Sequence, residues 1–558
     1  MLKTIRLGNF KAFSTTQIVP LRPLTIVFGP NSSGKSSLIH GLLFAHEAIT
    51  GDSPGNLDVT RPRIGGDAVD LGGFRQFVHR RDAESRVEWG VTIDVERLSG
   101  KVAEILKPAG EVTVLVHVGI TKIEQMESVA VQSYEIRTRD AKLLRASLKR
   151  RSEGWRLALD ELETENPVIM ETVRALVYAN TTTDKLDESD FESVNAAIDE
   201  LVPLLELQSG NFLPTGVVKA GASEQPDLRS SFYTLSKENR REELGQIAGL
   251  FVQRLLNTIV AGVNQHISFA IKKLRYLGPL RSYPSRHLAF SQEYDTNWFA
   301  GGGWAWDKVR QDPSVREKVN AWLGSAERMK TPYQLIVRDL YSSSDLEDPL
   351  WTTLEQIQKD GQDFEIEDES ESSSESSSSE SSASISDIER EVKRFNDNLQ
   401  KANIESIKDL VLLDVNRKTI VSHRDVGIGV SQVLPVLVSA YAARGEILAM
   451  EQPELHLHPA LQAELGDVFI ESAMLNKNSF ILETHSEHLI LRLMRRIRET
   501  TAKKNGSLPP LRAEDVCLLY MRPDVAGSEL VRLRLDENGN LIDPCPGGFF
   551  EEDFEEMF

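Results

Sequence analysis

The most constraining feature of this chain is a glycine-rich octapeptide near its start, Gly29-Pro-Asn-Ser-Ser-Gly-Lys-Ser36. It fits the pattern GxxxxGK[ST], follows the apolar run at residues 24–28 and precedes an apolar-faced segment at residues 36–49. We expect a strand, a tight loop and a helix in that order. Glycines let backbone N–H groups curl around phosphate oxygens, and the helix start adds positive potential there.

This loop predicts a nucleotide site with ATP and Mg²⁺ as cofactors. Lys35 is expected against the β- and γ-phosphates, and the Ser36 hydroxyl on Mg²⁺. The residues predicted to hold the nucleotide are Gly29, Pro30, Asn31, Ser32, Ser33, Gly34, Lys35, Ser36 and Ser37.

A second cluster lies some four hundred residues later and narrows the class of ATPase. Residues 445–454, GEILAMEQPE, read as a hydrophobic strand that ends in a carboxylate, the shape of a Walker B strand. Residues 480–486, FILETHS, form another apolar run that ends in a histidine, and LHLHP at 455–459 opens a helix between the two. Residues 426–432, VGIGVSQ, stand just before the helix that leads to the first of these strands.

This order of motifs resembles the ATP-binding-cassette ATPases, in their SMC, RecF and OLD-like branch. The resemblance is carried by IRLGNFKAF at 5–13, EQPELHLHP at 451–459 and ETHSEHL at 483–489. The chain looks most like AAA-type ATPases with a short DUF3696-like tail, which residues 547–552, GGFFEE, resemble. That group includes the PtuA-like subunits of Septu and retron-associated antiphage systems.

The resemblance implies a nucleotide site split between two copies of the chain. Gly429, Ser431 and Gln432 of a second copy would close on the γ-phosphate, although the plain LSGGQ signature is missing. Glu451 would hold Mg²⁺ through water, and His485 would be the switch histidine that senses the γ-phosphate. Gln76 is the candidate for a glutamine loop.

One departure from the usual cassette bears on catalysis. The position after the Walker B acid normally carries a glutamate that polarises the attacking water. Here that position is Gln452, which can orient water but cannot take its proton. Either Glu454 substitutes as the base, or hydrolysis is slow and ATP mainly locks the dimer, and we favour slow turnover.

The predicted fold class is α/β, an ABC-type P-loop ATPase head with an antiparallel β subdomain and a helical insertion. Alternation at period two predicts strands at 87–95, 111–120, 129–136 and 155–159, and helical patterns follow at 162–207 and 237–263. The predicted parts are an N-terminal ATPase half at 1–95, a β-meander and helical insertion at 96–270, a return segment at 271–350, an acidic disordered linker at 351–400 and a C-terminal ATPase half at 401–558.

Charge is concentrated in two acidic segments. The chain has a formal net charge of −20. Residues 360–389 hold eleven carboxylates and no Lys or Arg, and the last ten residues hold five more. An acidic total therefore does not exclude a basic groove elsewhere, and the Ser- and Glu-rich block at 361–386 is predicted to be disordered.

Several function classes are excluded at this stage. No apolar run approaches the roughly 20 residues of a membrane helix, so no membrane partner is expected. The two cysteines and the absence of a signal-peptide core predict a cytoplasmic protein. His456 and His458 are expected to be polar residues at a helix start rather than metal ligands. Only about seventy residues follow His485, too few for the nuclease domain of OLD-type proteins.

Two functions remain open. The chain is expected to be an ATP-gated regulator in a homodimer or higher even-numbered assembly. It is expected to control a separately encoded nuclease effector of HNH type, and a reverse transcriptase with its small DNA is a further expected partner. The alternative is a RecF-like repair ATPase that closes on duplex DNA, which would need a contiguous basic surface. Direct contact with nucleic acid is left open by the sequence.

Overall fold

A computed structural model of the chain describes residues 2–51, 56–123, 126–139, 141–151, 154–180, 188–208, 210–220, 240–281, 297–325, 328–367, 385–402, 404–421, 428–504 and 506–546. The chain divides into two compact units. Unit 1 comprises Met1–Ser282, Tyr294–Lys308 and Gly427–Phe558, and unit 2 comprises Tyr283–Glu293 and Val309–Val426.

A six-stranded sheet in unit 1 carries the predicted nucleotide motifs. Its order is β11-β15-β16-β3-β17-β18, and its strands are parallel except for β18, which pairs antiparallel with β17. Every residue of β3, β15 and β16 is buried, as expected for central parallel strands that are covered on both faces. The bounds are β3 (Leu24–Phe28), β11 (Leu274–Leu277), β15 (Ile447–Glu451), β16 (Ser479–Glu483), β17 (Val516–Arg522) and β18 (Glu529–Leu533).

A nine-stranded antiparallel sheet forms the rest of the β structure of unit 1. Its order is β10-β9-β8-β7-β6-β5-β4-β1-β2, so most neighbours in the chain are also neighbours in the sheet. The bounds are β1 (Leu2–Gly8), β2 (Gln17–Pro20), β4 (Val87–Asp94), β5 (Glu111–Ile123), β6 (Met126–Thr138), β7 (Lys142–Arg151), β8 (Gly154–Leu162), β9 (Leu205–Gln208) and β10 (Gly216–Lys219).

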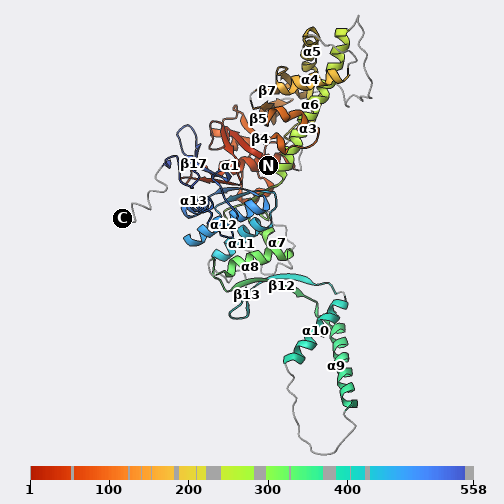
Figure 1. The fold of residues 1–558 in the computed structure, drawn as a ribbon, viewed down its shortest axis with the longest axis vertical. Coiled ribbons are helices and arrows are strands. Elements are labelled where there is room, and N and C mark those ends of the chain that lie inside the picture. Colours follow the sequence, from red (N-terminus) through yellow and green to blue (C-terminus); the bar gives the residue numbers. More distant parts are fainter. Residues whose placement is uncertain are drawn as a thin grey trace, which may run out of the picture. The chain divides into compact units, whose positions relative to one another are not determined.

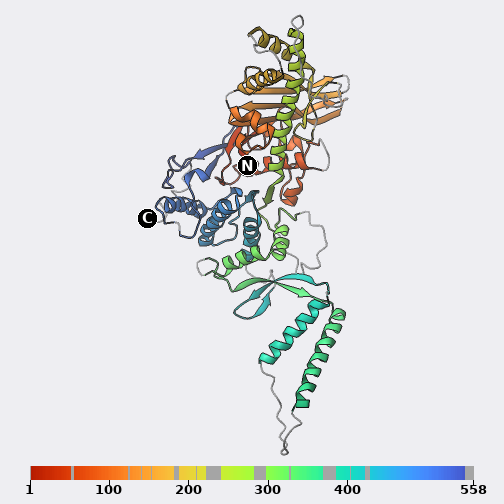
Figure 2. The ribbon, with the colours of Figure 1, turned by 45° about the vertical axis from the view of Figure 1, so that its right-hand side comes forward.

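Helices cover both sheets of unit 1, and the long helix α6 runs along the antiparallel sheet (Figure 2). One continuous apolar core joins α1, α6 and both sheets. The helices of this unit are α1 (Ser36–Thr50), α2 (Phe74–Phe77), α3 (Lys101–Leu106), α4 (Pro167–Asn180), α5 (Glu188–Leu201), α6 (Arg240–Lys272), α11 (Ile428–Ala442), α12 (Pro459–Asn476) and α13 (Glu487–Thr501), and α7 (Gly303–Gln311) continues into unit 2.

Unit 2 has a three-stranded antiparallel sheet, β12-β13-β14, and a pair of helices, α9 and α10 (Figure 1). The helix pair is joined by a buried amide: Asn398 Nδ2 donates to Thr353 Oγ1 at 2.9 Å and to Gln356 Oε1 at 3.1 Å. The elements are α8 (Pro313–Gly324), β12 (Tyr333–Leu340), α9 (Glu347–Glu367), α10 (Ile385–Lys401), β13 (Ile407–Asp414) and β14 (Thr419–Val421).

The structure confirms the predicted fold class and changes its details. The four predicted strands of the meander are present, joined by β7, whose five basic residues hid it from a hydrophobic pattern. Leu205 begins β9 and does not continue the predicted helical segment. The flanks of the predicted linker at 351–400 are helical in α9 and α10, since both segments carry apolar residues at helical spacing; residues 368–384 lie outside the described residues.

The observed units also differ from the predicted division of the chain. Residues 401–426, assigned to the C-terminal ATPase half, belong to unit 2, because β13 pairs with β12 and β14 rather than with the parallel sheet. None of the described helices is long and apolar enough to cross a membrane.

Candidate nucleotide site

The glycine-rich loop joins the end of β3 to the start of α1, as predicted. Gly29 has φ 142°, and a Cβ there would lie 2.7 Å from the Met521 carbonyl oxygen. Gly34 has φ 88°, and a Cβ there would collide with the Cβ of Ala12. Both positions therefore require glycine. The first turn of α1 has no acidic residue, which leaves its N-terminus attractive to phosphate.

Lys35 is folded back on its own loop. Its Nζ donates to the carbonyl oxygens of Gly29, at 3.1 Å, and Pro30, at 2.8 Å, and the residue is only 4% exposed. Burial lowers the pKa of Lys35, while the charges of Glu483 and Glu454 oppose that shift. A phosphate is a stronger acceptor than these carbonyls, so the lysine is placed to transfer its hydrogen bonds to a nucleotide.

Glu451, the predicted Walker B carboxylate, lies at the end of β15 beside Ser36. Its neighbour across the parallel pair of strands is Glu483, the last residue of β16. The Ser36 hydroxyl lies close enough to both carboxylates to lower the pKa of each. Burial, together with the charge of Glu483, raises the pKa of Glu451 to about 7.

Two further side chains hold Glu451, and the sequence did not identify either. Tyr276, on β11, donates its phenol hydrogen to Glu451 Oε1 at 3.0 Å. His40 Nε2 lies 3.7 Å from the same oxygen, and His40 Nδ1 is 2.8 Å from Lys11 Nζ. Burial lowers the pKa of His40 to about 3, so the ring is neutral and the lysine amine donates to Nδ1.

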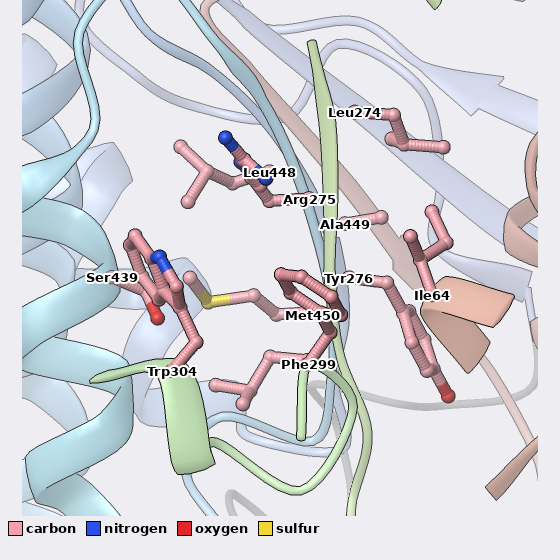
Figure 3. Close-up of a pocket in the computed structure, with 11 residues that line it drawn as sticks. Ile64, Leu274, Arg275, Tyr276, Phe299, Trp304, Ser439, Leu448, Ala449 and Met450 are labelled. Atoms are coloured by element: carbon pink, nitrogen blue, oxygen red, sulfur yellow. The ribbon is translucent and has the colours of Figure 1, made fainter. Parts of the chain in front are cut away.

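The ring of Tyr276 lines a mostly apolar pocket. The ring of Tyr276 and Ile64 lie on one side of β11, and Trp304 and Met450 lie on the other (Figure 3). Tyr276 is 4% exposed, and a buried phenol needs a hydrogen-bond partner. Glu451 supplies that partner.

The turn after β15 arranges the predicted catalytic residues. Gln452 has a left-handed φ of 45°, and its N–H donates to the Glu483 carbonyl oxygen at 2.8 Å. Glu454 is 6% exposed, and its Oε1 accepts from the backbone N–H of His485 at 2.8 Å. The predicted substitute base is therefore tied directly to the predicted switch histidine. Burial, with the nearby Lys35 charge, lowers the pKa of His485, so its ring is neutral at pH 7.

The predicted signature residues lie inside their own subunit. Ser431 is 2% exposed, and Gln432 Nε2 donates to the Arg281 carbonyl oxygen at 3.1 Å. Gly429 is half-buried in the first turn of α11. The described conformation therefore does not present the Ser431 and Gln432 side chains to a second copy, because they pack within the core of unit 1.

Arg281 connects this helix start to the catalytic turn. Its guanidinium donates to the carbonyl oxygens of Gln432, at 3.3 Å, Glu451, at 3.2 Å, and Gln452, at 3.0 Å. Burial lowers the pKa of Arg281 to about 10, so it remains charged at pH 7. Arg281 lies in the predicted return segment at 271–350, and no pattern in the sequence indicated this role.

The remaining candidates take ordinary positions. His458 Nδ1 accepts from the Ala460 N–H at 3.3 Å and caps α12, as expected for a polar residue at a helix start. Gln76 is exposed on α2, and its role as a glutamine loop stays a prediction. Residues 547–552, which resemble the family tail, lie outside the described residues.

The oxygen donors at this site fit Mg²⁺. Ser36 offers a hydroxyl and Glu451 a carboxylate, the hard ligands that Mg²⁺ accepts together with phosphate oxygens. In the part of the chain that the structure describes, no cluster of three or more His, Cys, Asp or Glu side chains could hold a metal ion by itself.

Comparison with known proteins yields two family matches and one curated relative. An AAA domain model matches residues 4–201, and an AAA ATPase domain model matches residues 328–490. The chromosome partition protein Smc of Synechococcus sp. is 51% identical over 45 residues, 8% of this chain and 4% of that protein. The match thus spans a small part of that relative's length.

Solved SMC head structures align over most of the chain at low similarity. The SMC head domain from Thermotoga maritima has 8% identity and a TM-score of 0.33, covering 96% of this chain and 99% of its own. The Smc head with an extended coiled coil from Pyrococcus furiosus, bound to part of ScpA, has 11% identity and a TM-score of 0.34, with 96% of each chain covered. The two AAA matches, read with the phosphate loop between β3 and α1, identify the chain as an ATPase.

Proposed function

We propose that this chain is an ATP-gated regulatory subunit that hydrolyses ATP slowly. The observation that carries the proposal is the turn after β15, where Gln452 replaces the expected base and Glu454 is tied to the backbone of His485. Gln452 can orient a water molecule, whereas proton removal falls to Glu454. An ATPase with such a turn is suited to holding a nucleotide-bound state for a long time.

The chain's own residues prepare the site for ATP. Lys35 is placed to move from its loop carbonyls to phosphate, and the N-terminus of α1 adds N–H donors. Ser36 and Glu451 would hold Mg²⁺, which neutralises the developing charge on the phosphates. The backbone N–H of His485 donates to the Glu454 carboxylate. A movement of His485 on loss of the γ-phosphate would therefore also move the proposed base.

We further propose that ATP binding joins two copies, or a higher even number, and that this assembly controls a separately encoded nuclease of HNH type in antiphage defence. This partner class comes from the resemblance to PtuA-like subunits. The first α11 turn at Gly429 is the element expected to face a second copy, through its backbone N–H groups, because the Ser431 and Gln432 side chains are buried.

Several basic residues of the chain are already paired with carboxylates, which favours a regulator over a DNA clamp of RecF type. Lys149 pairs with Asp160, and Arg151 lies 3.3 Å from Glu206. Arg496 is bound by Asp467 and Glu499. Cations that are already paired release fewer counterions from a phosphate backbone, which weakens nonspecific DNA binding.

Affinity purification of the tagged chain from its native host, with and without ATP, tests this proposal. Recovery of a nuclease, or of a nuclease with a reverse transcriptase and its small DNA, would support gated control of an effector. ATP-dependent recovery of bulk duplex DNA alone would instead favour the RecF-like clamp. A Lys35→Ala chain purified in parallel separates partners that need nucleotide from partners that do not.

A further inference from the structure

Three oxygen-bearing side chains from three elements meet at the start of α1. Ser36 is the first residue of α1, Glu451 is the last of β15 and Glu483 is the last of β16. Glu451 and Glu483 are directly paired across the parallel strands. The Ser36 hydroxyl lies close enough to both carboxylates to lower the pKa of each.

The two carboxylates cannot stabilise each other. Glu451 is 8% exposed and Glu483 is 5% exposed, so water screens their repulsion poorly. One hydroxyl donates only one hydrogen, and Ser36 therefore cannot satisfy both. The nearby cation, Lys35, donates hydrogen bonds to the carbonyl oxygens of Gly29 and Pro30 instead.

The two carboxylates differ in how their oxygens are used. Glu451 Oε1 accepts from the phenol of Tyr276 at 3.0 Å. Glu483 Oε2 is buried and has no hydrogen-bond partner among the residues that the structure describes. A buried carboxylate oxygen without a donor costs free energy unless something else binds it. Glu483 therefore keeps a lone pair available beside the Ser36 hydroxyl.

We propose that Glu483 is a second carboxylate ligand of the divalent cation, which would be held by Ser36, Glu451 and Glu483 together. This inference rests on the proposed ATP site and adds a ligand that the nucleotide motifs do not assign. Hard oxygen donors suit Mg²⁺ and Mn²⁺, and sites for Mg²⁺ typically use one or two carboxylates besides substrate phosphates. A divalent cation neutralises both buried charges at once, which explains why this fold tolerates them side by side.

Glu454 provides a matched control for Glu483. Both are buried glutamates near Lys35, and each has one oxygen without a partner in the described residues. Glu454, however, accepts from the His485 N–H and lies on the turn after β15 rather than in the strand pair. Removing its charge should leave cation binding intact if the strand-end pair forms the site.

Binding of Mn²⁺ to the full chain, followed by electron paramagnetic resonance without nucleotide and with ATP, tests the proposal. We expect Glu483→Gln to weaken Mn²⁺ binding by about 10–100-fold and Glu451→Gln by a similar factor. Glu454→Gln should stay within about twofold of the wild type. Equal affinity of Glu483→Gln and wild type for Mn²⁺ would overturn the proposal, and so would an equal loss in Glu454→Gln.

A separate measurement keeps this inference apart from the proposed function. Binding of a fluorescent ATP analogue in the presence of EDTA reports the phosphate loop without the cation. We expect Glu483→Gln to retain that binding, whereas wild-type protein that binds no analogue would contradict the ATP site itself. The Mn²⁺ titration without nucleotide still tests the carboxylate pair in that event. If Glu483→Gln does not fold, Glu483→Asp keeps the charge but moves it, and an unchanged Mn²⁺ affinity would count against direct ligation.

Discussion

The phenol oxygen of Tyr276 lies 3.0 Å from Glu451 Oε1 and donates a hydrogen bond to it. The bond joins the edge strand β11 to the end of β15, two segments 175 residues apart in the chain. It places a neutral donor on the acid that is expected to serve Mg²⁺ and stabilises the ionised form of that acid.

Burial of Glu451 sets the expected pH dependence of hydrolysis, and the Tyr276 bond adjusts it. Burial raises the pKa of Glu451 to about 7, and only the ionised carboxylate attracts a cation. Activity should therefore rise as pH increases through about 7. Tyr276→Phe removes a donor that lowers this pKa, so the inflection should move to higher pH by roughly one unit. Steady-state ATPase rates from pH 5.5 to 9 check this, with Tyr333→Phe in unit 2 as a control; an unmoved inflection would show that the bond does not tune Glu451.

The turn after β15 predicts opposite effects of two substitutions. Gln452→Glu supplies the acid that the usual cassette carries, and we expect ATP turnover to rise about tenfold or more. Glu454→Gln removes the proposed base and should lower turnover by about 10²-fold. Single-turnover hydrolysis of radiolabelled ATP measures both rates without the contribution of product release. If the hydrolysis rate of Gln452→Glu equals that of the wild type while the rate of Glu454→Gln falls strongly, Glu454 already supplies full base catalysis.

Lys35 should matter for nucleotide affinity far more than for folding. In Lys35→Ala, the expected contact of the ammonium with phosphate is lost, so ATP affinity should fall by about 10–100-fold. Isothermal titration with ATP and Mg²⁺ measures the change. Lys3→Ala is the control, since Lys3 is a surface lysine that pairs with Asp94 and Glu111. Unchanged ATP affinity in Lys35→Ala would argue against the phosphate loop.

Arg281 is expected to contribute stability as well as order. Its guanidinium satisfies three carbonyl oxygens in the buried region between α11 and the end of β15. Arg281→Ala leaves those acceptors without donors and should lower the free energy of unfolding by roughly 3 kcal/mol. Urea denaturation of the full chain measures this, and Arg417→Ala, at an exposed side chain, should change stability by less than about 0.5 kcal/mol. Equal midpoints for the two variants would contradict the structural role of Arg281.

The acidic linker remains a sequence prediction that hydrogen exchange can test. Residues 368–384 lie outside the described residues, and their Ser- and Glu-rich composition predicts rapid amide exchange. Amides of α9 and α10 near the Asn398 contact should exchange more slowly, because they are held in paired helices. Peptide-resolved exchange on the full chain compares both regions in one sample, and protected amides within 368–384 would contradict the prediction.

Local chemistry allowed the sequence to predict the phosphate loop and the strand ends. A loop that needs glycine at positions 29 and 34 and a lysine before a helix leaves a contiguous pattern, and so does a fully buried strand that ends in a polar residue. The same reasoning drew attention to Glu451, Gln452, Glu454 and His485, because each lies within a few residues of an apolar run, and their roles stay predictions. The family resemblance, by contrast, predicted Ser431 and Gln432 at a partner's nucleotide, and the structure buries both side chains in their own subunit.

The sequence by itself determined which backbone could bind phosphate and which position lacks the expected base, since both follow from residue type and spacing along one segment. Only the tertiary structure decided what surrounds them. The parallel pairing of β15 and β16 brings Glu483 next to Glu451, and the edge strand β11 delivers Tyr276. These contacts join segments that are far apart in the chain, and their formation depends on strand order, which no local pattern encodes.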